Sequence, residues 1–341
     1  MNKTKLIVRA LDIGYGACKF IRGLGHNGAP LTDSFPSIVK SLPDRSHVSS
    51  LARRDTCVIT INGQLYETGK DMDAAFDGGS NRTLHENFID TDEYAVLLKS
   101  ALYYMDEETI DLLVVGLPVS YMESKSAALR KLILGKHTVN NKTISVLGIH
   151  IVPQPIGGFM SLVKQEDIAP NIVKIQRNLL IDPGFFTVDY IAVRGLKEIN
   201  DLSGSTPHGM HTLLTRICEY ISKDFKINYN NISSIDEGLQ SGTFTLFGKK
   251  VALDKYVKKS IHVFKPAIKE ITNKIGDGRE VNQIILVGGG AKYLEPLLKK
   301  AFPLHPIVLC KAPQLSNVLG FQFIGELKAQ DLIKSGDKNA A

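Results

Sequence analysis

The sequence reads Asp12-Ile13-Gly14-Tyr15-Gly16-Ala17-Cys18-Lys19 near its start and Asp182-Pro183-Gly184-Phe185-Phe186-Thr187-Val188-Asp189 near its middle. Each stretch follows an apolar run and leads into another, which predicts a β-hairpin with Asp and Gly at its tip. Glycine lets the backbone turn sharply and approach a ligand closely. Backbone N–H groups in such a turn can bind an anion, and the aspartate can hold a cation. Two such turns, one in each half of the chain, predict a phosphate held between two related domains.

The composition is that of an ordinary globular protein. The chain has 341 residues, of which 43% are hydrophobic and 22% are charged, and this length favours two domains. The formal net charge of +6 permits an acidic partner without demanding one. The pairs Arg53-Arg54 and Lys249-Lys250 are interpreted as solvated loop charges, so the sequence predicts no direct nucleic-acid-reading element.

The cysteines and the length of the apolar runs indicate the cellular compartment in which the protein is expected. Cys18, Cys57, Cys218 and Cys310 are scattered without a CxxC pair, which argues against a zinc site or a disulfide framework. No apolar run approaches the roughly 20 residues of a membrane helix. We therefore expect a cytoplasmic protein without a membrane partner. The end of the chain, residues 334–341, is expected to be a frayed polar tail.

Predicted strands and helices alternate along the chain. In the first half, strands are expected at 5–11, 18–22, 110–117 and 143–152, a hairpin at 57–67 that turns at Asn62-Gly63, and helices at about 91–105 and 121–135. In the second half, hairpins are expected at 179–193 and 243–253, strands at 281–287 and 307–310, and helices at 208–224, 254–275 and 295–302. This order predicts an α/β protein with mixed sheets. The polar stretch 164–177, which contains Pro170, is the expected crossing between domains.

Three pieces of sequence carry candidate chemistry, and each has a plainer interpretation. Lys19 is placed to reach a phosphate, or it is an exposed residue of an ordinary hairpin. Asp182 ends an apolar strand, where an unpaired carboxylate is costly, so Mg²⁺ is expected beside it; otherwise it only caps the turn. A predicted strand runs into Gly288-Gly289-Gly290, which either admits a flat ligand such as a purine or forms a flexible loop.

In this order, the three pieces resemble the phosphate 1, phosphate 2 and adenosine motifs of the actin/Hsp70/sugar-kinase ATPase superfamily. Residues 152–159, Val-Pro-Gln-Pro-Ile-Gly-Gly-Phe, and residues 311–321 resemble its two connecting helices, so the resemblance spans nearly the whole chain. It implies an actin-like (ribonuclease H-like) duplicated α/β fold, with two domains of mixed sheets flanked by helices and a nucleotide cleft between them. The implied bounds are 1–165 for domain I, with a small inserted subdomain at about 33–95 and with 322–341 packing back on it, and 166–321 for domain II.

Within the superfamily, the chain most resembles the bacterial actin-like proteins of the ParM/StbA type, which segregate plasmids. The residues that carry this resemblance are Gly116-Leu117-Pro118-Val119, Ser34-Phe35-Pro36-Ser37 and Asn317-x-x-Gly320-Phe321. The resemblance implies a slow ATPase that polymerises with ATP–Mg²⁺ into dynamic, head-to-tail, multi-stranded filaments. It also implies plasmid segregation through an adaptor protein bound to a centromere-like DNA site.

The resemblance assigns roles to residues of the cleft. Asp12 and Asp182 would hold hydrated Mg²⁺, and Gln154 would orient the attacking water; these three are the implied catalytic residues. ATP, or GTP, would contact the two turns and the glycine run: Gly14, Tyr15, Gly16, Ala17, Lys19, Gly184, Phe185, Phe186, Thr187, Gly288, Gly289 and Gly290. Gln154 stands where the ParM pattern has glutamate, so catalysis is expected to rest on orientation and electrostatics. Pro183 removes one N–H donor from the second turn.

Two other functions stay open. A small-molecule, sugar-type kinase on the same fold would need a catalytic aspartate over a substrate hydroxyl, and none stands out beyond Asp12, Asp182 and Asp189. A cell-shape or cell-division scaffold filament is the other alternative. Such relatives often carry a membrane-binding amphipathic terminus, and the sequence predicts none.

Overall fold

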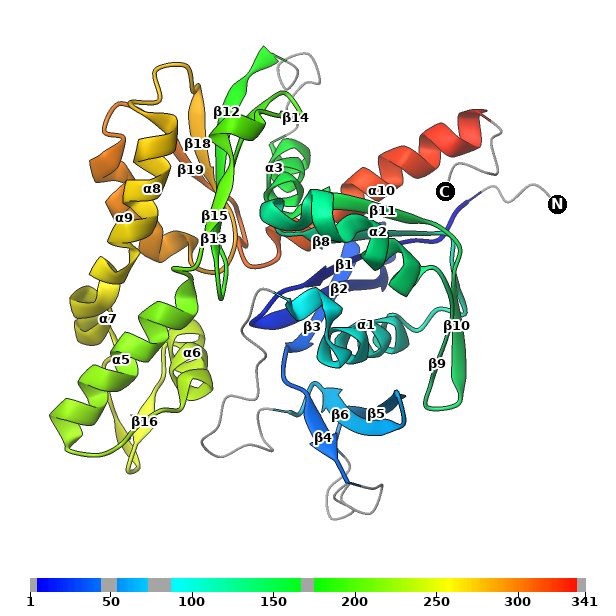
Figure 1. Cartoon of the computed structure of the whole chain (residues 1–341), viewed down its shortest axis with the longest axis horizontal. Coiled ribbons are helices and arrows are strands. Elements are labelled where there is room, and N and C mark those ends of the chain that lie inside the picture. Colours follow the sequence, from blue (N-terminus) through cyan, green and yellow to red (C-terminus); the bar gives the residue numbers. More distant parts are fainter. Residues whose placement is uncertain (1–4, 44–53, 73–86, 167–174, 336–341) are drawn as a thin grey trace.

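A computed structural model of the chain describes residues 5–43, 54–72, 87–166 and 175–335. They form two bodies that lie side by side, with the first half of the chain in one and most of the second half in the other (Figure 1). Arg53, Pro170 in the predicted crossing, and the predicted tail beyond residue 335 lie outside the described residues.

The first body is built on a five-stranded mixed sheet with the order β11-β8-β1-β2-β3. Strands β1, β8 and β11 run parallel, whereas β1, β2 and β3 form an antiparallel meander. These strands are β1 (Val8–Ile13), β2 (Ala17–Leu24), β3 (Pro30–Pro36), β8 (Leu112–Leu117) and β11 (Ile149–Pro153). Two small sheets extend the body, β7-β10-β9 and β4-β6-β5. Their strands are β4 (Lys40–Leu42), β5 (Thr56–Ile61), β6 (Gln64–Gly69), β7 (Thr109–Ile110), β9 (Gly135–Val139) and β10 (Lys142–Val146).

The second body repeats the plan on a six-stranded sheet with the order β14-β13-β12-β18-β19, with β15 paired to β13. As in the first sheet, an antiparallel hairpin (β12–β13) joins in parallel to a strand from later in the chain (β18). The strands are β12 (Arg177–Pro183), β13 (Val188–Arg194), β14 (Lys197–Glu198), β15 (Gly204–Thr206), β18 (Gln283–Leu286) and β19 (Ile307–Leu309), with a separate hairpin β16 (Thr245–Leu246) and β17 (Lys249–Lys250). The two predicted Asp–Gly hairpins are therefore confirmed.

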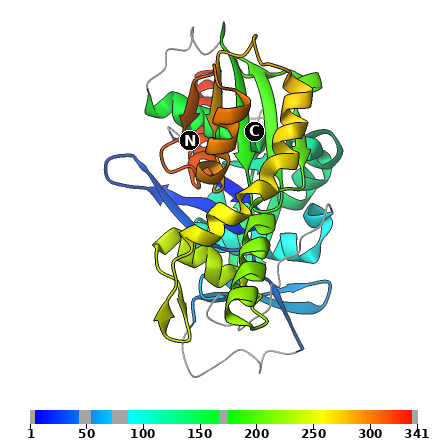
Figure 2. The same ribbon diagram turned by 90° about the vertical axis from the view of Figure 1, so that its left-hand side faces the viewer.

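Helices cover both sheets. Those of the first half are η3 (Phe88–Asp90), α1 (Asp92–Met105), η4 (Val119–Tyr121), α2 (Met122–Ile133) and α3 (Gln154–Gln165). Those of the second half are η5 (Asn200–Leu202), α5 (Met210–Phe225), α6 (Ile232–Ser241), α7 (Asp254–Ser260), η6 (Ile261–Phe264), α8 (Lys265–Ile275), α9 (Ala291–Ala301) and α10 (Ser316–Ser335). Seen from the side of the second body, its yellow and orange helices lie over the green strands β12 and β13 (Figure 2).

The alternation of side chains along β1 and β12 shows how each sheet is covered on both faces. Leu11 packs into the cluster that contains α1, while Ala10 packs into the cluster that contains Phe321 of α10. Likewise, Leu179 faces α5 and α9, while Leu180 faces α3. Successive strand residues point to opposite faces, so these continuous apolar runs are those of covered sheets.

Helices α3 and α10 cross between the two bodies, and each packs on the sheet of the other half of the chain. The buried residues of α3 join the second sheet, whereas those of α10 join the first. The crossing is close because it is lined by glycine: a Cβ atom at Gly320 would lie 1.7 Å from the carbonyl oxygen of Gly157. The helix pair therefore connects the two bodies mechanically.

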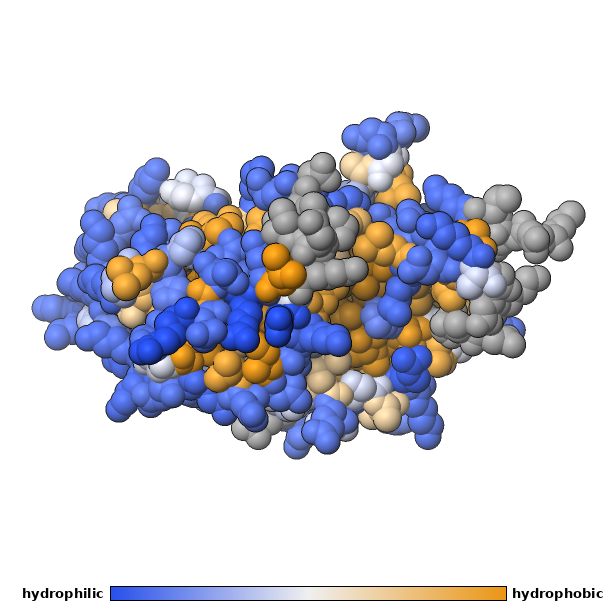
Figure 3. Space-filling view, turned by 90° about the horizontal axis from the view of Figure 1, so that it is seen from above, coloured by the Kyte–Doolittle hydropathy of each residue, from blue (hydrophilic) through white to orange (hydrophobic). Residues whose placement is uncertain are grey.

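The surface is mostly hydrophilic, and apolar side chains on the upper face gather near the middle of the molecule (Figure 3). Within the part of the chain that the structure describes, none of the helices combines the length and the apolar character needed to cross a membrane.

The structure corrects several predicted elements of the first half. The strand expected at 143–152 is two strands, β10 and β11, which belong to different sheets and part at Leu147-Gly148. The helix expected at 121–135 ends at Ile133, and Gly135, with φ of +112°, begins the unpredicted strand β9. By contrast, the Asn62-Gly63 turn is confirmed, since both residues have positive φ.

The second half differs from its prediction at three places. The helix expected at 254–275 is broken by the 3₁₀ turn η6, because Pro266 starts α8 as a new helix. The hairpin expected at 243–253 has strands of only two residues. Helix α6 was not predicted, and the helix expected at 295–302 begins earlier, at Ala291, with Pro296 inside it.

Candidate functional site

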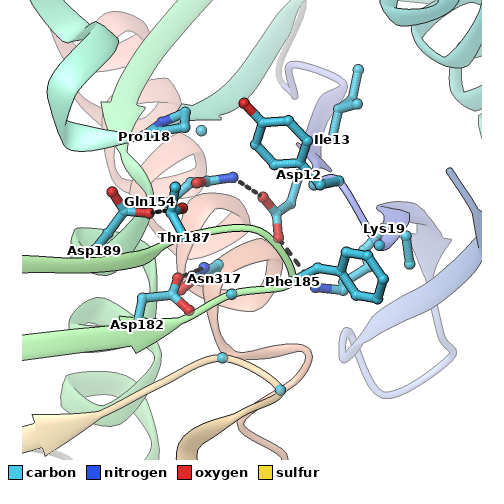
Figure 4. A pocket seen from close by; sticks show the side chains of 18 of the residues that line it. Asp12, Ile13, Lys19, Pro118, Gln154, Asp182, Phe185, Thr187, Asp189 and Asn317 are labelled. Carbon is cyan, nitrogen blue, oxygen red and sulfur yellow. Dashed lines mark hydrogen bonds and ion pairs between the residues drawn. The ribbon is translucent and has the colours of Figure 1, made fainter. Parts of the chain in front are cut away.

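A cavity lies where the two hairpin turns face each other across the bodies, as the close view in Figure 4 shows. Most of the predicted site residues line it: Asp12, Gly14, Tyr15, Gly16, Ala17, Lys19, Gln154, Asp182, Gly184, Phe185, Thr187, Gly288 and Gly289. Phe186 and Gly290 do not line the cavity. Gly290 instead donates its N–H to the carbonyl of Pro183, at 2.9 Å, and so supports the second turn from behind.

The first turn buries a carboxylate between an ammonium group and a side-chain amide. Asp12 is 2% exposed and pairs across the hairpin with Lys19, whose Nζ lies 3.5 Å from Asp12 Oδ2. Gln154, the first residue of α3, donates from Nε2 to Asp12 Oδ1 at 2.7 Å. The turn itself is closed by the N–H of Gly14, which donates to the carbonyl of Ala17 at 3.1 Å. Asp12, Lys19 and Gln154 are thus brought together as the sequence predicted.

The second turn buries Asp182, which is 5% exposed. Asn317 of α10 donates from Nδ2 to Asp182 Oδ2 at 2.7 Å. The pKa of Asp182 is raised to about 7, chiefly by burial and with help from the negative charges of Asp189 and Asp12, against the opposing effect of Asn317 and Lys19. The other carboxylate oxygen faces Gly288, which has a φ of +74° and where a Cβ atom would lie 1.9 Å from Oδ1. Only glycine fits this position.

Asp189 is a site residue to which the sequence analysis gave no role. It is 3% exposed, and Asp189 Oδ2 accepts a hydrogen bond from Thr187 Oγ1 at 2.8 Å. Its Oδ1 has no hydrogen-bond partner among the described residues, and burial raises its pKa to about 6 against the opposing effect of Ser205 and Thr187. Asp189 is the cross-strand partner of Asp182. That register could have identified it, because cross-strand partners share a sheet face.

The wall of the cavity beside the glycine run was also missed. Asp236 and Gln240 line it from α6, together with Gln314 and Leu315 from the segment before α10. The signal for α6 was present: the side chain of Asn231 caps the helix by accepting from the N–H of Ser234 at 3.0 Å.

The donor set fits a polyphosphate with a divalent cation. Buried carboxylates face the cavity from both bodies, and carboxylate oxygen is the ligand that Mg²⁺ prefers. Among the described residues no group of three or more His, Cys, Asp or Glu side chains could hold a metal ion by itself. Mg²⁺ usually keeps several waters and shares substrate phosphates, so two carboxylates suit it better than a closed cage would. Lys19 and the glycine turns provide the positive side of the site.

Comparison with known proteins agrees with this geometry. Residues 10–157 match the family model of the N-terminal domain of actin-like proteins, and residues 180–300 match that of the C-terminal part of the archaeal actin homologue MreB-like. No curated protein sequence matches the chain significantly.

Solved structures share the fold over nearly the whole chain. The psk41 ParM protein in its apo form is 19% identical with a TM-score of 0.68, covering 97% of this chain and 100% of its own. The archaeal actin homologue Ta0583 in complex with ADP is 19% identical with a TM-score of 0.72, covering 94% and 100%. A 15-stranded ParM filament from Clostridium botulinum contains a subunit that is 22% identical with a TM-score of 0.71, covering 95% and 100%.

Two mixed sheets flanked by helices, with facing hairpin turns between them, define an actin-like fold. The two family models together match most of the chain, and both describe actin-like proteins. The chain is a member of the actin-like protein family.

Proposed function

We propose that this chain is an actin-like ATPase that binds ATP with Mg²⁺ in the cleft and polymerises into dynamic filaments. The observation that carries the proposal is the pair of buried carboxylates, Asp12 and Asp182, on facing turns of two bodies at one cavity. An archaeal relative was solved with ADP, and a ParM relative as a filament, which supports the nucleotide and the self-association. The finer proposal is plasmid segregation through an adaptor, with domain bounds at 1–165 and 166–321.

The residues of the cleft divide the binding work. Asp12 and Asp182 would hold Mg²⁺ through water, and Lys19 with the backbone of the two turns would bind the phosphates. The bound metal would neutralise phosphate charge. Gly288 and Gly289, beside Gln314 and Leu315, would leave room for the base.

Two side chains are suited to a water molecule that attacks the terminal phosphate. Gln154 uses its Nε2 on Asp12, which leaves Oε1 to accept a hydrogen bond from the water. An amide cannot take up the proton, but the carboxylate of Asp189 can, because it lines the cavity and its pKa of about 6 leaves it mostly ionised at neutral pH. Hydrolysis would then rest mainly on orientation and be slow.

Replacing Asp189 by asparagine is expected to lower the rate of ATP hydrolysis about 100-fold, the scale of a lost general base. Nucleotide affinity should change little, because the proposal assigns Asp189 to the attacking water and not to the phosphates. Phosphate release and ADP affinity, measured on the same preparation, separate the two effects. Equal losses in affinity and in rate would contradict this role and make Asp189 a binding residue.

Filament formation is expected only with nucleoside triphosphate and Mg²⁺. Pelleting and electron microscopy at tens of micromolar protein would measure polymer with ATP, GTP, a non-hydrolysable ATP analogue or ADP. The comparison of ATP with GTP would show which nucleotide is preferred. Polymer should persist with the analogue and decay with ATP as hydrolysis proceeds. A chain that stays monomeric with the analogue would exclude the filament proposal.

The kinase alternative predicts a different result in the same assays. ADP release would rise with a hydroxyl substrate when the protein is incubated with a panel of sugars. Without such a rise, the protein hydrolyses ATP without a second substrate, and the kinase alternative fails. A cell-shape scaffold would then be distinguished from a plasmid-segregating filament by its binding to liposomes.

A further inference from the structure

Two aromatic residues at the tip of the second turn reach across the cleft to the first body. The ring of Phe186 lies 4.9 Å from that of Tyr15 in the first turn. The ring of Phe185 lies against Gly16, where a Cβ atom would be 2.9 Å from it, and Figure 4 shows it beside Lys19. Both phenylalanines pack against the core cluster of the first body although they lie in the turn between β12 and β13 of the second, and Phe185 also packs against the core of the second body.

The receiving side is an aromatic cluster of the first body. Tyr15 is 8% exposed and stacks on Phe88 of η3, with ring centroids 4.8 Å apart, and Phe88 meets Tyr94 of α1 edge to face at 5.4 Å. Phe186 thus adds to a stack that is already anchored in the core. Such pairs contribute beyond their area burial.

The backbone of the second turn is held by its own body. The N–H groups of Gly209, Met210 and His211 at the start of α5 donate to the carbonyls of Phe186, Gly184 and Phe185, at 3.0, 2.9 and 2.7 Å. The main chain is therefore fixed to the second body while the ring of Phe186 packs on the first. The ring of Phe185 lies between the two bodies, against Gly16 on one side and edge to face with His211 of α5 on the other, at 5.8 Å. Any separation of the turns must withdraw the rings and expose them to water.

We propose that Phe185 and Phe186 are positioning residues that latch the two phosphate turns together and set the rate of nucleotide exchange. The inference rests on the proposed function, since it assigns a regulating contact to the same cleft. The rings lie at the turns whose backbones face the cavity, so withdrawal of the rings opens the phosphate end of the site. An apolar contact of this kind carries no charge, so its strength does not depend on which ions the cleft holds.

The first test is the release of fluorescent ADP from the Phe186→Ala protein. Release should be at least about 10-fold faster than from the wild type. The half-buried ring stabilises only the state in which the two turns are in contact, so its removal favours the open state. Phe247→Ala is the matched control, because Phe247 stands 73% exposed at the tip of the β16–β17 hairpin of the same body. Phe186→Leu, which keeps an apolar contact, should restore most of the wild-type rate.

The second test uses the contact between Gly16 and Phe185. Gly16→Ala should also speed ADP release, because the new methyl group displaces the ring, and adding Phe185→Ala should remove the extra effect of that methyl group. If Gly16→Ala has the same effect with and without Phe185, the methyl group acts on the phosphate directly and the latch is overturned at that contact.

Hydrogen exchange of the nucleotide-free protein provides a readout independent of nucleotide. Amides of residues 14–17 and 184–187 should exchange faster in Phe186→Ala, with the melting temperature near that of the Phe247→Ala control. Failure of the wild type to bind ADP would defeat the proposed function, whereas faster exchange would still support the contact between the turns. Unchanged release and unchanged exchange together would overturn the latch.

Discussion

Replacing Asp182 by asparagine is expected to abolish Mg²⁺-dependent hydrolysis and, at the same time, to stabilise the nucleotide-free protein at alkaline pH. Both effects have one cause. The carboxylate of Asp182 is buried beside those of Asp189 and Asp12, and such a cluster of acids is tolerated only with a cation or with bound protons. Asparagine keeps the size of the side chain but removes both the metal ligand and the charge.

The sign of the pH dependence follows from the raised pKa. In the folded protein the pKa of Asp182 is about 7 instead of 3.8, so the folded state keeps a proton that the unfolded chain has released. The resulting stabilisation is fully present below pH 3.8 and is lost as the pH rises through about 7. The wild type should therefore lose stability between pH 5 and pH 8 relative to Asp182→Asn. The difference in free energy of unfolding between the two proteins should reach about 2–4 kcal/mol, given roughly 1.4 kcal/mol for each pKa unit.

Thermal unfolding of both proteins without nucleotide, at several pH values, measures this difference. Asp277→Asn is the control, because Asp277 is exposed and its pKa is lowered to about 2 beside Arg279. The difference in stability between Asp277→Asn and the wild type should stay small and should not grow with pH. A flat difference for Asp182→Asn would contradict the assigned cause of the raised pKa, and unchanged hydrolysis would overturn the metal role.

The parts of the site that the sequence predicted are those encoded locally. An aspartate and a glycine between two apolar runs specify a turn, and the turn places Asp12 opposite Lys19 whatever the rest of the chain does. Gln154 was assigned through the resemblance of residues 152–159 to a connecting helix, and the structure places it as the first residue of α3. The duplicated plan of the sheets followed from the same two hairpins, because each joins a later parallel strand.

What the sequence missed depends on distant contacts or on weak local signals. The apolar run at 143–152 continues across the break between β10 and β11, so periodicity could not reveal that its halves belong to different sheets. Helix α6 is short, and with it Asp236 and Gln240 were lost from the predicted site. The backbone of Phe186 is expected to contact the nucleotide, but the contact of its ring with Tyr15 is one that no local pattern specifies.

The crossing of α3 and α10 provides the second large expected effect, since Gly320→Ala should destabilise the folded protein by about 3 kcal/mol or more, at the upper end of overpacking costs. A Cβ atom at Gly320 would lie 1.7 Å from the carbonyl oxygen and 2.5 Å from the carbonyl carbon of Gly157. Both atoms are backbone, which cannot rotate away as a side chain does. Alanine is the better helix former by about 1 kcal/mol, so the loss would occur against local propensity.

Gly325→Ala on the same helix is the matched comparison. Its Cβ atom would meet side-chain atoms of Val8 and Val114, at 2.5 and 2.8 Å, and those side chains can shift by small rotations. Urea unfolding should therefore rank Gly320→Ala well below Gly325→Ala in free energy of unfolding. Because α3 packs on the second sheet and α10 on the first, parting the helices also parts the bodies, so Gly320→Ala should lose nucleotide affinity as well. Equal stability of the two variants would mean that the helices do not approach at Gly157 and Gly320, and the mechanical link between the two halves of the cleft would have to lie elsewhere.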